Sequence, residues 1–404
     1  MFLLLNRALL LLLIVMLLAS CTNSEEKELL ELDTPIRIAY FSEQNFKNRY
    51  ASLIENDAKF SNLTYEIVPT SELIKGTIDI DEWMKGNNFD IIYAPGLQLE
   101  QFVERDKLVH LDSPAWKSDL SMESFDKTAI ELSKLYGKGE VYGIPPGVEG
   151  RSIIFNKKIF DQYKIPYPDD YLTWNEFIDL AMQFQGFGLT VPMESGFELI
   201  WEIGQTNNLS IYRANPLSIS YNTEPWSKIW ERVHMALTTD VIKTGDYFLS
   251  TFLEGNTAMS LITNRQYIEL SRKNPTFDWG IVTAPVAEDG NRATKQMYAD
   301  GFYAISATSP HHDAAKEWLN FLMSGKSIEL DRLSGHYGAD TKHSSHTNPF
   351  KEALFKLKPQ KKEMLPYEYL QIGEEGLQRL LTESVSTEEV LNSIQAKASE
   401  LAKE

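Results

Sequence analysis

The chain has 404 residues, of which 43% are hydrophobic and 24% charged, as expected for a soluble protein with more than one core. Its formal net charge of −18 argues against nucleic-acid binding, because neutralising phosphates requires clustered lysine and arginine. The single cysteine excludes a disulfide within the chain. We therefore expect a two-lobe globular protein that has no nucleic-acid partner.

The first apolar segment is too short to cross a membrane. Residues 8–18 form an apolar run after Arg7, whereas a spanning helix needs about 20 residues. The run leads into Ala-Ser-Cys at Cys21 and then into polar residues, which resembles a bacterial lipoprotein signal. We predict a signal peptide over 1–20, a lipid anchor on Cys21 and a tether over 21–34. This predicts an exported protein held on the outer face of the cell membrane by lipid alone.

Strands and helices alternate over the next hundred residues. Strands are expected at 36–41, 63–68 and 89–93, with a helix over 46–60 and another around Leu99, Phe102 and Val103. This alternation is typical of an α/β domain with a mainly parallel sheet. Ligands bind beyond the carboxyl ends of such strands, so two loops are candidate ligand loops. Their candidate residues are Ser42, Glu43, Asn45 and Tyr93; plain turns are the alternative.

The same pattern restarts after residue 150. Thr173 and Glu176 form a capping box that opens a helix over 174–184, and Ser309 with Pro310 is expected to open the helix 311–323. The strand 258–262 is expected to run into a polar loop, Thr263–Arg265. Further strands are expected at 152–155, 277–282 and 302–305, and further helices at 158–163, 197–205, 225–237, 247–254 and twice within the last 30 residues.

Five ordered motifs resemble the family 1 extracellular solute-binding proteins, the maltose-binding-protein-like receptors of ABC importers. The central motif is YGIPPGVEGRSIIFNKKIFDQYKIPYPDDYLTWNEFIDLA, and the others include FLEGNTAMSLITN, FDWGIVTAPV and ADGFYAISATSPHHDAAKEWLNFLMS. The resemblance covers most of 36–404. It implies two α/β lobes, each a mixed, mainly parallel sheet flanked by helices, with a ligand cleft between them. It also implies a ligand-binding protein without enzymatic activity.

The resemblance also implies how the chain is divided and where its ligand binds. One lobe would comprise 35–147 plus 301–345 and the other 148–300 plus 346–404, with the first crossover at Val148-Glu149. Glu149 matches a carboxylate that hydrogen-bonds sugar hydroxyls, and glycines beside it suit a hinge. The ligand that the resemblance implies is a carbohydrate, with an oligosaccharide expected, delivered by a monomeric receptor to importer permease subunits. No cofactor and no metal is expected.

Two stacking tryptophans of the maltose-type pattern are replaced by Ala94 and Arg265. Other aromatic residues can cover the sugar faces instead, although each of them also suits a core position. Arg151 and Arg265 can bind a carboxylate or phosphate, so an anionic ligand is a subordinate hypothesis. The remaining candidates are Trp201, Asn264, Asp300, Tyr337 and Tyr367.

Two other function classes stay open at this point. A secreted carbohydrate-active enzyme needs a carboxylate pair, for which Glu149 and Asp300 are the candidates. A co-receptor for a membrane sensor kinase would use the same ligand-closing body. His343 and His346 are spaced for a metal only if helical, and the sequence SSHTNP around them favours a solvated loop.

Overall fold

The computed structural model describes residues 34–403, except for 58, 62, 115, 117–124, 187, 215, 246–248, 324–336 and 339–347. The predicted signal peptide, the lipid anchor at Cys21 and the tether as far as residue 33 lie outside the described residues, as do His343 and His346. No helix in the described part of the chain is long and apolar enough to cross a membrane.

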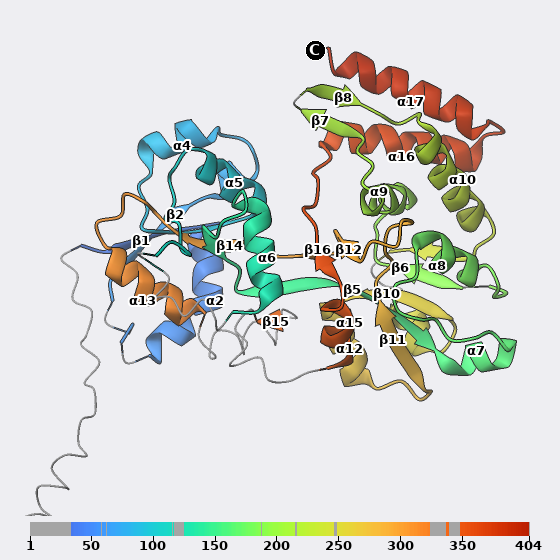
Figure 1. Cartoon of the computed structure of the whole chain (residues 1–404), viewed down its shortest axis with the longest axis horizontal. Helices are drawn as coiled ribbons and strands as arrows, with labels where there is room; N and C mark the ends of the chain where they lie inside the picture. The colour runs from blue at the N-terminus through green and yellow to red at the C-terminus, as the bar shows by residue number, and fades with distance from the viewer. Residues whose placement is uncertain are drawn as a thin grey trace, which may run out of the picture.

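Two separate sheets organise the molecule (Figure 1). Sheet 1 has the order β2-β1-β3-β14-β4, with β1 parallel to β2 and β3, and β14 antiparallel to β3 and β4. Its strands are β1 (Ile36–Tyr40), β2 (Tyr65–Pro69), β3 (Ile91–Ala94), β4 (Gly143–Ile144) and β14 (Phe302–Ile305). We call this sheet and its helices the first lobe.

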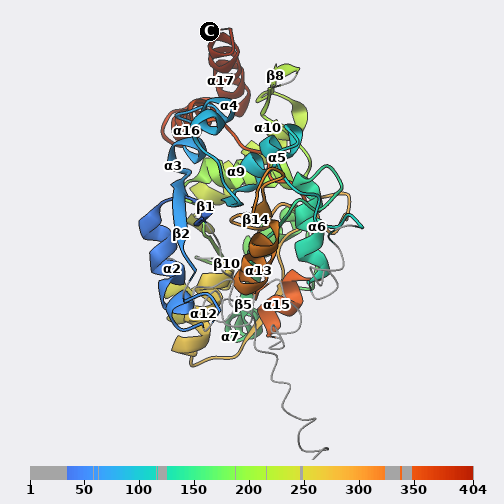
Figure 2. The ribbon, with the colours of Figure 1, turned by 90° about the vertical axis from the view of Figure 1, so that its left-hand side faces the viewer.

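Helices cover both faces of sheet 1, because alternate residues of its buried strands point to opposite sides. Phe302 lies against Tyr136 on one face, whereas the next residue, Tyr303, lies against Tyr50 on the other. The helices are α2 (Glu43–Glu55), α3 (Ser71–Ile74), α4 (Ile80–Gly86), α5 (Gly96–Glu104), α6 (Lys127–Tyr136) and α13 (His312–Leu322). Figure 2 shows α2 and α6 on opposite sides of β1 and β14.

Sheet 2 forms the core of the second lobe, with the order β11-β5-β10-β6-β9. β5 is antiparallel to β10 and β11, whereas β6 is parallel to β10 and β9. Its strands are β5 (Gly147–Asn156), β6 (Leu189–Val191), β9 (Ile242–Thr244), β10 (Met259–Thr263) and β11 (Trp279–Thr283). Two short pairs lie outside both sheets: β7 (Tyr212–Ala214) with β8 (Leu217–Ile219), and β12 (Ala293–Thr294) with β16 (Lys358–Pro359).

Buried tryptophans join the helices of the second lobe to one another. Trp174 donates its indole N–H to Thr206, and a side chain on Gly204 would meet the ring of Trp226 at 1.9 Å. The helices are α7 (Lys157–Tyr163), α8 (Trp174–Ala181), α9 (Gly196–Thr206), α10 (Glu224–Thr238), α11 (Leu249–Leu253), α12 (Asn264–Lys273), α15 (Pro349–Leu354), α16 (Tyr367–Thr382) and α17 (Thr387–Leu401).

The long strand β5 carries the connection between the lobes (Figure 1). Its last half pairs within sheet 2, whereas its first residues pair with two short strands, β13 (Met297–Tyr298) and β15 (Tyr337–Gly338). β13 precedes β14 of sheet 1, so the chain returns to the first lobe beside the strand on which it left. The crossings are therefore hydrogen-bonded to one another, which restricts how the lobes can move apart.

Three local predictions about residues at helix starts were wrong. The predicted ligand loop with Ser42, Glu43 and Asn45 is the start of α2: Ser42 caps this helix, and its hydroxyl accepts the N–H of Asn45. Thr263 likewise caps α12 in a capping box with Gln266, so no polar loop follows β10. Ser309 does not cap α13, which His311 precedes; its hydroxyl donates to the buried Asp90. The capping box of Thr173 with Glu176 is confirmed.

Candidate ligand-binding cleft

A cleft of about 1010 Å³ lies where the two lobes meet. The first lobe contributes residues around α3 and α4 and the turn that opens α5, and the second lobe contributes β7. The crossing strand and the segment after β16 contribute the rest. Its lining includes Leu73–Gly76, Ile78–Ile80, Pro95–Gln98, Gln101, Tyr136, Tyr212, Arg213, Tyr298, Ala299 and Lys361–Met364. Three tyrosines from different elements thus face one space.

The segment after β16 joins both walls of this cleft. Lys361 contacts the first lobe, because its ammonium lies 2.5 and 2.6 Å from the two carboxylate oxygens of Glu100. Two residues further on, the backbone N–H of Glu363 donates to the side chain of Gln205 in α9, at 2.9 Å. The segment is therefore fixed to both lobes, and it defines the position of the cleft residues Lys361–Met364.

Glu149 and Tyr298 lie opposite each other at the crossover, because the register of β13 on β5 pairs the two residues. The hydroxyl of Tyr298 is hydrogen-bonded to the carboxylate of Glu149. Burial raises the pKa of Tyr298 far above its usual value, and the negative charge of Glu149 raises it further. Tyr298 is therefore a neutral hydrogen-bond donor. It lines the cleft, and its hydroxyl holds the carboxylate of Glu149 beside the cleft.

Asn264 fixes the backbone of the crossover strand. Its side chain is 2% exposed, and its amide oxygen accepts the N–H of Gly150 at 2.9 Å. Its amide nitrogen donates to the carbonyl of Val148 at 3.2 Å. The amide thus binds the residues on both sides of Glu149. A Cβ atom on Gly150 would lie 2.3 Å from Leu354, so the strand is also closely packed there.

A buried ion cluster lies behind this strand. Glu202 of α9 is 4% exposed, and its carboxylate lies 3.4 Å from the guanidinium of Arg151 and 3.8 Å from the ammonium of Lys362. The ammonium of Lys362 also lies 5.9 Å above the ring of Trp201. Arg151 therefore neutralises a buried carboxylate of its own lobe, and Trp201 lies next to a cleft residue.

Comparison with known proteins places this geometry in a family. The profile described as bacterial extracellular solute-binding protein matches residues 82–338, which is more than half of the chain. The chain belongs to this family. Because the family is extracellular, this solute-binding protein is exported, and the relatives that it resembles are binding proteins rather than enzymes.

Three relatives describe how far the similarity extends. An uncharacterised ABC transporter extracellular-binding protein of Pyrococcus horikoshii is 22% identical over 243 residues, 56% of this chain; the match spans about half (52%) of that relative's length. A family 1 extracellular solute-binding protein of Alicyclobacillus acidocaldarius has a TM-score of 0.69 at 12% identity, covering 92% of this chain and 100% of that one. The sugar-binding protein MalE of Xanthomonas citri has a TM-score of 0.67 at 13% identity, covering 92% and 98%. These likenesses establish the two-lobe fold.

The predicted site residues of the first lobe of this solute-binding protein are only partly brought together. Tyr93 stacks on Tyr40 with ring centroids 5.2 Å apart and lies over Gly301, so its ring is packed within the lobe beside the crossing. Burial raises the pKa of Tyr93 far above its usual value. The exposed Asp300 is close enough for its charge to add to that effect. The exposed side chain of Glu43 pairs with Lys47.

The other predicted residues lie in different surroundings. Asn45 is exposed and its amide oxygen accepts the hydroxyl proton of Ser42, at 2.6 Å. Arg265 is exposed in the first turn of α12 and does not line the cleft. Tyr367 is 65% exposed at the start of α16, and its hydroxyl accepts from Gln371. The backbone of Tyr337 pairs with Val148, but its side chain lies outside the described residues.

None of the predicted site residues is among the residues that line this cleft, although Glu149 pairs with the lining residue Tyr298. Lys75, Arg213, Lys361 and Lys362 were not predicted, and neither was the hydrogen bond of Tyr298 with Glu149. The run KPQKKEMLP is the one signal that points to this region, because prolines surround its lysines and exclude a regular helix. Lys75 and Arg213 carry no such signal, since exposed basic residues occur throughout the chain.

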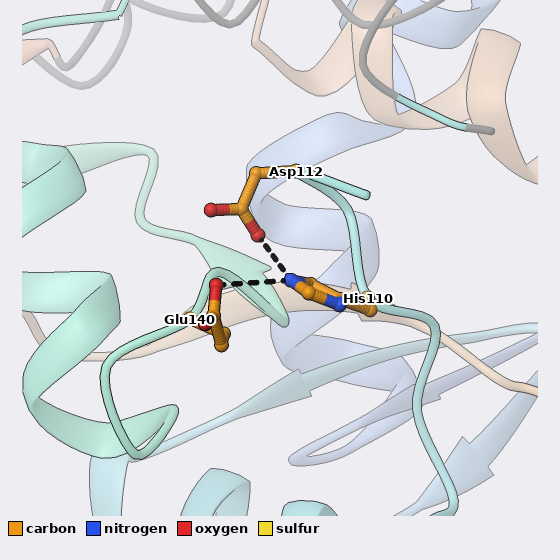
Figure 3. A group of neighbouring side chains, drawn as sticks. All are labelled: His110, Asp112 and Glu140. Atoms are coloured by element: carbon orange, nitrogen blue, oxygen red, sulfur yellow. Dashed lines mark hydrogen bonds and ion pairs between the residues drawn. The ribbon is translucent and has the colours of Figure 1, made fainter. Parts of the chain in front are cut away.

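Among the described residues, His110, Asp112 and Glu140 are the group that can hold a metal ion (Figure 3). His110 Nε2 lies 2.7 Å from Asp112 and 3.2 Å from Glu140. Asp112 also accepts the backbone N–H of Val141, and the N–H of Leu111 donates to the carbonyl of Val141. These bonds join 110–112 to the segment before β4, and this is the role that we assign to the group.

Replacing His110 by alanine is expected to lower the stability of the first lobe by about 1 kcal/mol, because the imidazole links two carboxylates on neighbouring segments. The melting temperature should fall by about 2–4 °C. EDTA should leave the melting curve of the unmodified protein unchanged. Scanning calorimetry of both proteins, with and without EDTA, checks this; a melting temperature that falls with EDTA would show that a metal occupies the group.

Proposed function

We propose that this protein is the carbohydrate receptor of an ABC importer. The observation that carries the proposal is the cleft at the crossover, which is lined by Tyr136, Tyr212 and Tyr298, the last of them bonded to Glu149. Tyrosine rings cover the apolar faces of sugar rings, and a carboxylate accepts several hydroxyl protons. The description of the Xanthomonas citri relative as sugar-binding supports a carbohydrate ligand for this chain.

The proposed mechanism is exchange between open and closed arrangements of the lobes. The first lobe comprises 35–147 plus 301–345, and the second comprises 148–300 plus 346–404. A ligand that contacts both walls stabilises the closed form, which then delivers it to the permease subunits. Glu149 accepts sugar hydroxyls, while Arg151 and Asn264 hold the strand that carries it. Trp201, beside the lining residue Lys362, and Asp300, close to the crossing, are the other predicted residues that we retain as proposed contacts. The remaining predicted contacts are not among the residues that line this cleft: Ser42, Glu43, Asn45, Tyr93, Arg265, Tyr337 and Tyr367.

The proposed setting is the outer face of the cell membrane. Cleavage before Cys21 and acylation of its thiol would anchor a monomer through lipid, with residues 21–34 as a tether. No cofactor and no metal enters the proposed mechanism. Labelling with a radioactive fatty acid, compared between the natural protein and Cys21→Ser, tests the anchor directly.

A saccharide that binds in the cleft is expected to raise the melting temperature and to reduce the radius of gyration. The first effect follows because the ligand binds only the folded protein, and the second because closure brings the lobes together. A thermal-shift screen of mono- and oligosaccharides, followed by small-angle scattering with the best of them, checks both. Identical scattering curves with and without a tightly bound saccharide would contradict lobe closure.

Two alternatives make different predictions. An importer receptor is required for uptake of the radiolabelled saccharide, whereas a co-receptor for a sensor kinase is required only for the transcriptional response. A carbohydrate-active enzyme would degrade the bound saccharide. Uptake and transcription measurements in a deletion strain separate the importer receptor from the co-receptor, and chromatography of the saccharide after prolonged incubation tests for the enzyme. Hydrolysis that disappears in Glu149→Gln would replace the receptor proposal by the enzyme.

A further inference from the structure

The charge of the cleft is opposite to that of the whole chain. Acidic residues outnumber basic ones 57 to 39 in the sequence, which gives the net charge of −18. Among the cleft-lining residues the ratio reverses, with Lys75, Arg213, Lys361 and Lys362 against Asp79 and Glu363. A concave site lined by one sign of charge focuses the field and attracts ligands of the other sign.

Two of these cations are already paired within the protein. Lys361 binds Glu100, and Lys362 lies 3.8 Å from the buried Glu202. The two acidic residues are also engaged. Asp79 caps α4 by accepting the N–H of Asp81, at 2.7 Å, and Glu363 lies 3.6 Å from Lys295. The internal pairs therefore account for most of the charged groups in the lining.

Lys75 and Arg213 remain. Both side chains are exposed, and neither has an ion-pair partner among the residues that the structure describes. Lys75 follows α3 in the first lobe, whereas Arg213 belongs to β7 in the second. One uncompensated cation therefore lies on each wall of the same cleft, and closure of the lobes brings positive charge from both sides toward whatever the cleft holds.

We propose that the ligand of this cleft is an acidic oligosaccharide, with an anionic ring substituent bound by Lys75 from one lobe and Arg213 from the other. This rests on the proposed carbohydrate function and adds the charge of the ligand. The tyrosines supply faces for sugar rings, and Arg213 offers a planar fork that fits a carboxylate or sulfate. The cations differ from those that the sequence indicated, since Arg151 is paired with Glu202 and Arg265 lies outside the lining.

The experiment compares saccharides that differ in charge alone. Trigalacturonic acid, its methyl ester and a sulfated disaccharide are titrated into the complete protein by calorimetry, with maltotriose as a second neutral sugar. We expect the acid to bind about 10- to 100-fold more tightly than its ester, because the ester loses the charge-assisted bonds. The affinity for the acid should fall as the ionic strength rises toward about 0.15 M, whereas that for the ester should not. Preference for the sulfated sugar over the uronate would identify sulfate as the anionic group.

Variants assign the effect to the two cations. Lys75→Gln and Arg213→Gln are each expected to weaken binding of the acid about tenfold and to leave binding of the neutral ester unchanged. Arg272→Gln is the matched control, because Arg272 is exposed in α12 and does not line the cleft. If neutral sugars bind as tightly as acids, or if both variants bind the acid normally, the inference is overturned while the carbohydrate function stands. If no saccharide of either charge binds, both fail.

Discussion

Replacing Asn264 by alanine is expected to lower the free energy of unfolding by about 2–4 kcal/mol. The substitution removes a side chain that bonds to both the Gly150 N–H and the Val148 carbonyl. Both backbone groups lie at a buried crossing, so each loses a partner that water does not readily replace. Urea unfolding followed by tryptophan fluorescence measures the change as a lower midpoint.

An exposed asparagine provides the control for this variant. Asn222 donates to Asn392 at the surface, at 3.1 Å, and Asn222→Ala should shift the urea midpoint very little. Asn264→Asp keeps an acceptor for Gly150 but loses the donor to Val148 and places a negative charge beside that carbonyl at a buried position. We expect its midpoint to be no higher than that of Asn264→Ala. A midpoint of Asn264→Ala equal to that of the natural protein would refute the assigned role.

Replacing Glu149 by glutamine is expected to weaken saccharide binding by about 10- to 100-fold, which corresponds to the loss of charge-assisted hydrogen bonds. The substitution keeps the size of the side chain and its place opposite Tyr298. It exchanges a carboxylate that accepts several hydroxyl protons for an amide with a single accepting oxygen. Isothermal calorimetry with the saccharide found by thermal shift measures the difference.

Two further variants show whether the effect belongs to the cleft. Tyr298→Phe keeps the ring in the lining but frees the carboxylate of Glu149, and we expect a smaller loss of affinity, about tenfold or less. Glu131→Gln changes an exposed glutamate of α6 and should leave binding unchanged. If Glu149→Gln and the natural protein bind the saccharide with equal affinity, Glu149 is not a ligand contact. Its match to the sugar-binding carboxylate of the family would then be wrong.

Local signals predicted most of the elements of the fold. The helices α8, α9 and α10 and the strands β1 and β10 lie within a few residues of their predicted bounds, because periodic apolar positions and caps act over short distances. Two helices were expected within the last 30 residues; α17 lies there, whereas α16 begins earlier, at Tyr367. The missed cap at Thr263 had the same signal as the confirmed one at Thr173, namely a threonine three residues before Gln or Glu. That error was one of interpretation, since the information was present.

The site depended on contacts that short patterns do not contain. In the sequence, Glu202 is an ordinary glutamate of an amphipathic helix. The structure shows that Arg151 and Lys362, which are distant in the sequence, lie beside its carboxylate. The sequence shows Asn264 as a polar residue after a strand. In the structure its amide oxygen accepts the backbone N–H of Gly150, which is 114 residues away in the sequence. Glu149 could be predicted as a site residue because the family resemblance places it at the crossover between the lobes. The residues around it in the sequence do not indicate that position.

The position of β14 has a consequence for the order in which the molecule can assemble. β14 lies between β3 and β4, although it follows all the strands of sheet 2 in the sequence. A chain that emerges from its N-terminus during export can complete sheet 2 once residue 283 has appeared. Sheet 1 has to wait until residue 305, with β3 left as an unpaired edge that can pair with other chains. The second lobe waits longer still, because α16 and α17, which pack on α9 and α10, end only at Leu401. Neither lobe can therefore finish folding before a late segment of the chain has emerged, and the exposed edge of β3 is the feature that an extracytoplasmic chaperone would need to protect.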